Sequence, residues 1–276
     1  MKKVFRKAIW LVFFAVFVFS GVMLLRQWND NTGGEMTYAG AMEIALNTPK
    51  QDAQVTEPVS NDAEENDQFV PYWMPAPVED DPVMAEMAQI NLAALREVNP
   101  DVLGWIRIPD TKVDYPLLQG EDNDFYLQHT WDKTPNSVGS IFMEHLNSPD
   151  LMDYNTIIYG HNMNNGSMFS ALQDFALQSH WQTHPYVYIV TDAGVYRYEI
   201  FAFSQASVES LTYGLNPALD HTKENFLDLS LENSRIDTGI RPAITDRILT
   251  LSTCSGMDYS SRYVLQARLA MVEVTE

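Results

Sequence analysis

The segment RILTLSTC, residues 247–254, has the alternation of a β-strand that ends at the only cysteine of the chain. Successive side chains of a strand point to opposite faces, so Ile248, Thr250, Ser252 and Cys254 share one face. A Ser-Gly pair follows directly and predicts a turn. The end of a strand is a place where a fold presents a side chain rigidly to a cleft. Cys254 is therefore a candidate nucleophile, and the alternative is a buried structural thiol.

Arg262 begins the next strand-like run, residues 262–272. If this run pairs antiparallel with the cysteine strand, Arg262 lies at the same end of the sheet as Cys254. A guanidinium there can hold a thiolate or a developing oxyanion with fixed donors. Arg268 is an equal candidate by alternation, and a third interpretation is that Arg262 is a surface residue.

A cysteine nucleophile needs an acid or base nearby, and six histidines compete for this role. His161 follows an apolar run, residues 156–160, and begins a polar loop, residues 162–167. A loop residue held by a rigid strand is a common arrangement for function. Two other groups resemble weak metal sites and are interpreted as structural: His145 with Asn147 and Asp150, and His180 with His184.

Composition excludes several classes of protein. The formal net charge of −20 over 276 residues argues against a nucleic-acid partner, because such proteins need a basic surface. A single cysteine excludes an intramolecular disulfide and a zinc site of several cysteines. The hydrophobic content of 46% is ample for a packed core.

The N-terminus carries a charge-free apolar run, residues 8–25, that would span about 27 Å as a helix. Basic residues cluster before it, which predicts a cytoplasmic N-terminus and an extracellular remainder. A cleaved signal peptide is the alternative, but the run is long for one and no cleavage site follows it directly. We expect residues 1–26 to form a cytoplasmic tip and a single-pass anchor in the cell membrane.

Two further regions follow the anchor. Residues 27–82 are acidic and contain several prolines, which predicts a flexible linker. Residues 36–46 are compatible with a short helix. Residues 83–276 contain eight short strand-like runs and a few helical ones, which predicts a mainly β catalytic domain, a barrel or a sandwich. The expected strands cover residues 104–108, 113–118, 139–143, 156–159, 186–191, 195–202, 247–254 and 262–272.

Several motifs together resemble those of sortases. The TLSTC segment ending at Cys254, with Arg262, looks like their cysteine motif. YGHNM, residues 159–163, followed by GSMF, residues 166–169, looks like the histidine motif of the class B branch. Supporting similarity lies in NPDVLGWI, VDYPLLQ, DNDFYL and GSIF, which begin at residues 99, 113, 122 and 139.

This resemblance implies an eight-stranded β-barrel with peripheral helices, preceded by the transmembrane helix. It implies a cysteine transpeptidase that cleaves a C-terminal sorting signal after threonine. Cys254 would form the thioacyl enzyme, and Arg262 would bind the oxyanion or position the substrate. His161 would protonate the leaving amine and later deprotonate the incoming one.

By the same resemblance, Asn123, Tyr126 and Ser252 would lie near the substrate groove. The implied partners are surface proteins with a sorting signal, which class B similarity suggests is Asn-Pro-x-Thr-like, and the amine of a lipid-linked cell-wall precursor. No cofactor and no metal are expected. No acidic third member of the site is evident, although Asp258 lies in the loop before Arg262.

Three alternatives stay open. The same residues would serve a cysteine hydrolase that releases the acyl group to water. A catalytically inactive, membrane-tethered binding domain is a second alternative, against which Cys254, His161 and Arg262 argue. Polymerisation of pilins, with a protein lysine as acceptor, is a third.

Overall fold

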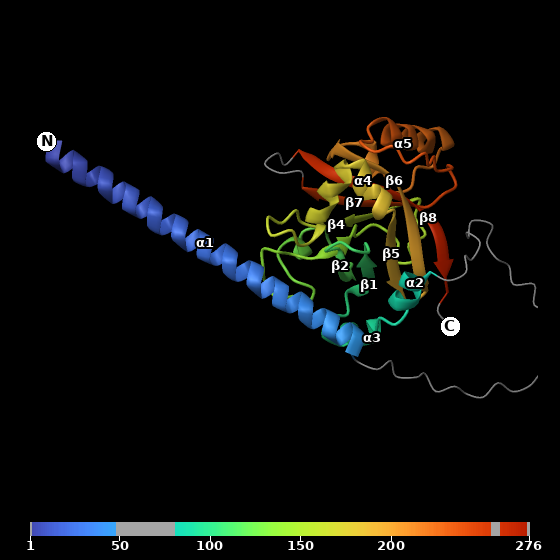
Figure 1. Cartoon of the computed structure of the whole chain (residues 1–276), viewed down its shortest axis with the longest axis horizontal. Coiled ribbons are helices and arrows are strands. Elements are labelled where there is room, and N and C mark those ends of the chain that lie inside the picture. Colours follow the sequence, from blue (N-terminus) through green and yellow to red (C-terminus); the bar gives the residue numbers. More distant parts are fainter. Residues whose placement is uncertain (1, 48–80, 255–259, 275–276) are drawn as a thin grey trace, which may run out of the picture.

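Eight strands close into one barrel in the order β1-β2-β3-β4-β7-β8-β6-β5 (Figure 1). The computed structural model describes residues 2–47, 81–254 and 260–274. The strands are β1 (Val102–Arg107), β2 (Asp114–Leu118), β3 (Ile141–Met143), β4 (Asn155–Tyr159), β5 (Tyr186–Thr191), β6 (Gly194–Ser207), β7 (Ile248–Cys254) and β8 (Ser261–Glu273). The pairs β2–β3 and β4–β7 are parallel and the other neighbours are antiparallel. The predicted mainly β, eight-stranded barrel is confirmed.

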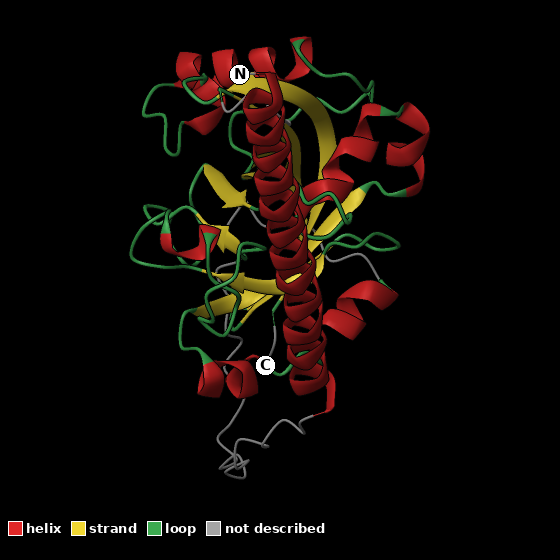
Figure 2. Ribbon diagram, turned by 90° about the vertical axis from the view of Figure 1, so that its left-hand side faces the viewer, coloured by secondary structure: helices red, strands yellow, loops and turns green. Residues whose placement is uncertain are grey.

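Helices lie around the wall of the barrel (Figure 2). They are α1 (Lys2–Asn47), α2 (Pro82–Met87), α3 (Leu92–Val98), α4 (Gln178–Thr183) and α5 (Asp220–Glu232), with 3₁₀ turns η1 (Phe125–Leu127), η2 (Phe169–Ala176) and η3 (Leu211–Tyr213). The segment before β1 forms two helices, α2 and α3, rather than one. The break occurs because the Asn91 side chain accepts the Ala94 amide at 3.1 Å and starts α3.

The alternation of β7 separates two apolar clusters. Leu249 and Leu251 belong to the main core of the barrel. Ile248, on the opposite face, packs in a second cluster with Phe226 and Leu227 of α5. The face of β7 that carries Ile248 therefore lies outside the barrel core, on the side that α5 covers.

Helix α1 differs from the predicted division into anchor and flexible linker. It continues without a break to Asn47, so residues 27–47 are helical. Tyr38, Ala41 and Ala45 follow helical spacing and are buried against the barrel. This tertiary contact stabilises a segment that its acidic composition indicated as a linker, apart from the short helix considered for residues 36–46. Residues 48–80 of the predicted linker lie outside the described residues.

The first half of α1 is a candidate membrane span. Within the described part of the chain it is the one helix long and apolar enough to cross a membrane. The side chains of Trp10 and of residues 12–25 are largely exposed, including Phe13 and Phe17. A helix that is apolar all round and covered by no protein is suited to lipid. Figure 1 shows this half projecting away from the barrel, with the N-terminus at its far end.

Candidate active site

Three neighbouring strands bring the predicted catalytic residues to one end of the barrel wall. β4 runs parallel to β7, with Tyr159 opposite Ser252, and the Gly160 amide donates to the Ser252 carbonyl at 3.2 Å. His161 follows Tyr159 by two residues and Cys254 follows Ser252 by two, so both come at the same end of this parallel pair. β8 returns antiparallel, with Arg262 directly opposite Cys254. Cys254 is the last residue of β7, as the sequence predicted.

The His161 ring is held by backbone on the neighbouring loop. Its Nε2 lies 2.7 Å from the Leu127 carbonyl oxygen. A carbonyl only accepts, so Nε2 carries the proton of the neutral ring. Nδ1 is then the nitrogen that can take up and release a proton. The His161 carbonyl accepts the Phe169 amide at 2.9 Å, which also holds the backbone of the histidine.

The two candidate arginines separate clearly. Arg268 pairs with Ile248, which is the first residue of β7 and so lies at the far end of that strand from Cys254. Its Nε and Nη2 donate to Glu199 at 3.1 and 2.8 Å, which indicates a structural ion pair. Arg262 lies at the cysteine end, and its Nη1 donates to the Ser261 carbonyl at 3.0 Å. Of the two arginines, only Arg262 is paired with Cys254, which is the position predicted for an oxyanion ligand.

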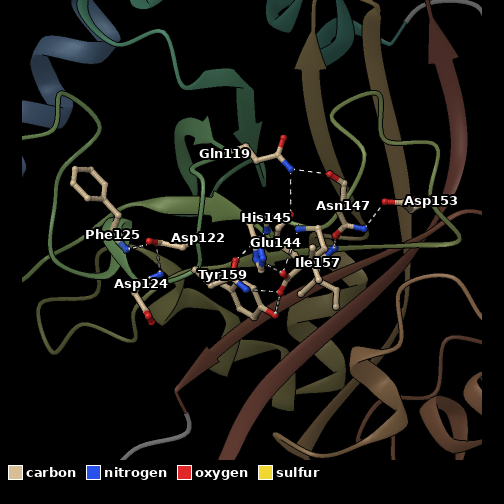
Figure 3. A network of polar contacts seen from close by, with 12 residues as sticks. Gln119, Asp122, Asp124, Phe125, Glu144, His145, Asn147, Asp153, Ile157 and Tyr159 are labelled. Carbon is tan, nitrogen blue, oxygen red and sulfur yellow. Dashed lines mark hydrogen bonds and ion pairs between the residues drawn. The ribbon is translucent and has the colours of Figure 1, made fainter.

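A buried carboxylate that the sequence did not single out lies next to these strand ends (Figure 3). Glu144 accepts hydrogen bonds from Asn123 Nδ2 at 2.7 Å and the Tyr159 hydroxyl at 2.9 Å, and its Oε1 lies 2.8 Å from His145 Nδ1. The Asn123 Oδ1 accepts the His145 amide at 3.0 Å. The available signal was an acidic residue directly after the apolar run of β3.

Tyr159 links this carboxylate to the catalytic end of β4. Burial and the adjacent Glu144 carboxylate raise the pKa of Tyr159 well above its usual range, and the Arg262 guanidinium acts in the opposite sense. Tyr159 therefore stays a neutral hydrogen-bond donor at physiological pH.

The other two predicted substrate residues are buried. Ser252 is 1% exposed, and its hydroxyl is bonded to that of Tyr213, in η3, at 2.9 Å. Tyr126 has no exposed surface; its hydroxyl donates to Asp101 Oδ2 at 2.6 Å and accepts from Asn99 at 2.9 Å. The hydrogen bonds of Tyr126 hold the backbone next to Leu127, and the bond between Ser252 and Tyr213 holds η3 against β7. Of the three predicted substrate residues, Asn123 alone is partly exposed.

Two other sequence interpretations concern acidic and metal sites. Asp258 lies outside the described residues. In residues 2–47, 81–254 and 260–274, no group of three or more His, Cys, Asp or Glu is placed to hold a metal ion. The Asn147 amide of the His145 loop bonds Asp153 at 2.6 Å and the Asn155 carbonyl at 3.0 Å, which is a structural role.

Comparison with known proteins gives a consistent result. The Sortase domain model matches residues 106–270. Sortase B of Listeria monocytogenes is 36% identical over 183 residues, which cover 65% of this chain and 74% of that protein.

The chain belongs to the sortase family.

Solved structures assign it to class B. The Staphylococcus aureus sortase B–substrate complex superimposes with a TM-score of 0.64 at 29% identity, over 70% of this chain and 91% of that one. A crystal structure of sortase B complexed with triglycine gives a TM-score of 0.64, also at 29% identity, over 70% and 92% of the two chains. The protein is thus a class B sortase, and its activity is that of a sortase-type cysteine transpeptidase.

The register of β7 and β8 predicts a sharp difference between its two arginines. Arg262→Lys keeps the charge but loses the planar fork, so peptide cleavage should slow by about 10²-fold or more. Arg268→Lys is the matched control, because it makes the same change on the same strand, opposite the other end of β7. It should leave the cleavage rate close to wild type. Equal losses in the two variants, measured as kcat/KM on the same peptide, would contradict the assignment.

Proposed function

We propose that this sortase cleaves a C-terminal sorting signal after threonine and transfers the acyl group to an amine of a cell-wall precursor. Cys254 is the nucleophile, His161 the acid–base residue and Arg262 the oxyanion ligand. The observation that carries this proposal is the register of the three strands: Arg262 is opposite Cys254, and His161 follows the end of β4 that is paired with β7.

The first half of the reaction forms a thioester. The Cys254 thiolate attacks the threonine carbonyl carbon, and the carbonyl oxygen becomes an oxyanion facing the Arg262 guanidinium. The peptide C–N bond then breaks, and the leaving amine takes a proton from Nδ1 of the His161 imidazolium. The products are a thioacyl enzyme and the released C-terminal peptide.

The second half consumes the thioester. An incoming amine loses a proton to Nδ1 of neutral His161 and attacks the thioester carbonyl. The C–S bond breaks, an amide forms, and Cys254 leaves as a thiolate. The hydrogen bond from Nε2 to the Leu127 carbonyl supports this cycle, because it reserves one nitrogen for proton transfer throughout.

Small amines and peptides are the substrate classes that the relatives' structures indicate. One relative is described with a substrate and another with triglycine, which presents a free amine. Near the strand ends, the partly exposed Asn123 and the Glu144–Tyr159 pair offer polar groups. We propose Asn123 as a substrate contact, and a peptide amide side chain is a suitable partner for it.

The anchor favours a membrane-bound acceptor. About 8 Å of helix separates Leu25, the end of the apolar run, from Asp30, the first α1 residue bonded to the barrel. The active site is thus held near the membrane, where a lipid-linked precursor is presented, with the N-terminus cytoplasmic and the catalytic domain extracellular. Such tethering raises the effective concentration of the acceptor.

Transfer rather than hydrolysis should dominate the product mixture. The full chain in detergent micelles is incubated with the best substrate from an Asn-Pro-x-Thr peptide library and increasing triglycine or diamino acid. Mass spectrometry should show amide growing with amine concentration at the expense of free acid. Free acid as the main product with every amine tested would mean that the protein acts as a hydrolase.

The proposed orientation predicts which side of the membrane a protease reaches. Protease added to intact protoplasts should remove the catalytic domain and leave a small anchored fragment that contains the N-terminus. An N-terminal tag should survive until the protoplasts are lysed. Protection of the catalytic domain in intact protoplasts would reverse the orientation, and recovery of a soluble mature form would indicate a cleaved signal peptide.

A further inference from the structure

The second half of α1, residues 30–47, packs against the barrel rather than projecting from it. Tyr38, Ala41 and Ala45 are 9%, 0% and 1% exposed. Gly34 permits the close approach, because a Cβ there would lie 3.0 Å from Val138 Cγ2. Glycine is costly inside a helix, so its presence at this contact favours a packing role.

Several hydrogen bonds of this half-helix meet one segment, residues 126–140. The Tyr38 hydroxyl donates to the Gly139 carbonyl at 2.6 Å and lies 3.0 Å from the Ser140 hydroxyl. Other bonds join the Trp131 indole to the Thr37 carbonyl at 3.0 Å, and Asn136 Nδ2 and the Ser137 hydroxyl to Asp30 at 3.0 and 2.7 Å.

The opposite side of the same segment holds His161. The Leu127 carbonyl accepts from the ring, and the Ser140 amide donates to the Tyr126 carbonyl at 2.9 Å. Gly139 has φ +63° and lies against the ring, since a Cβ there would be 2.8 Å from His161 Cδ2. Gly139 therefore lies between Tyr38 and the histidine ring and contacts both.

A second set of contacts reaches the loop after His161. The Tyr38 ring packs edge-on against that of Tyr115, with centroids 5.2 Å apart. The Tyr115 hydroxyl accepts the Met168 amide at 3.0 Å, next to the Phe169 amide that holds the His161 carbonyl. Tyr38 thus supports both the ring and the backbone of the histidine.

We propose that Tyr38 is a positioning residue for His161, so that the helix that anchors the protein also sets the geometry of acid–base catalysis. The inference rests on the proposed role of His161. Tyr38 touches neither the histidine ring nor the strand end that carries Cys254; it acts through Gly139 and Leu127. Its loss should therefore slow the chemical steps while leaving the affinity for the peptide unchanged.

Tyr38→Phe removes one hydroxyl and keeps the ring contact with Tyr115. In the full chain in micelles, kcat should fall roughly 10-fold or more, because a small misplacement of an acid–base group is costly, and KM should stay within about 2-fold. Tyr188→Phe is the matched control. Tyr188 is also buried, and its hydroxyl donates to Asp81 at 2.9 Å. Both variants should lower Tm by about 2–4 °C, and only Tyr38→Phe should lower kcat.

Substitutions at two glycines test the same segment without changing α1. Gly139→Ala pushes a methyl group against the histidine ring, whereas Gly239 has a similar φ of +68° and nothing within 4 Å of its would-be Cβ. Both variants suffer the backbone strain of a left-handed alanine, and the Gly139 methyl group would also meet the Tyr126 and Leu127 carbonyl oxygens at 2.8 Å, so a loss of kcat confined to Gly139→Ala reports on the packing of this segment around His161. This pair also serves if Tyr38→Phe folds poorly.

The outcomes separate the inference from the proposed function. Wild-type kcat in Tyr38→Phe and Gly139→Ala, with an inactive His161→Ala, would overturn the positioning role and leave the catalytic assignment intact. An active His161→Ala would overturn the catalytic assignment itself. Equal losses of kcat in Tyr38→Phe and Tyr188→Phe would reduce the effect to general stability and also contradict the inference.

Discussion

The register of three strands is the constraint on which the site depends. β4 is parallel to β7, so the residues that follow β4 emerge at the same end as the last residue of β7. β8 is antiparallel to β7, so its first residues start at that end too. A one-residue slip in a strand turns every side chain to the other face. The apolar clusters on the two faces of β7 oppose such a slip, because Leu249 and Leu251 fill the barrel while Ile248 meets α5. Core packing thus fixes which residues meet at this end of the sheet.

Helix α1, whose first half is the candidate membrane span, packs directly against the barrel through its second half. Helix α1 contacts the catalytic domain within a few residues of its apolar run. Its hydrogen bonds reach the segment that holds His161. The same contacts place His161 one segment of chain away from α1, because Tyr38 bonds the Gly139 carbonyl and Gly139 lies against the histidine ring.

Sequence reasoning succeeded where the information is local. Alternation along residues 247–254 placed Cys254 at a strand end, and the step from apolar strand to polar loop marked His161. It could not separate Arg262 from Arg268, because both lie on one face and only pairing with β7 distinguishes them. It missed Glu144, whose partners Asn123 and Tyr159 come from distant segments.

Sequence reasoning interpreted residues 27–47 as part of a linker because the face buried by Tyr38, Ala41 and Ala45 is small and exists only against the barrel. It proposed Tyr126 as a substrate contact, whereas the structure buries that side chain completely.

The most direct test is the mass of the enzyme during turnover. The chain has a single cysteine, so a thioester can form at one position only. Full-length protein is mixed with the sorting peptide without added amine, quenched in acid and measured intact. We expect a mass increase equal to the peptide portion that ends in threonine, located on Cys254 by fragmentation and removed within one turnover when triglycine is added. Peptide cleavage with no adduct, or an adduct on another residue, would contradict the account.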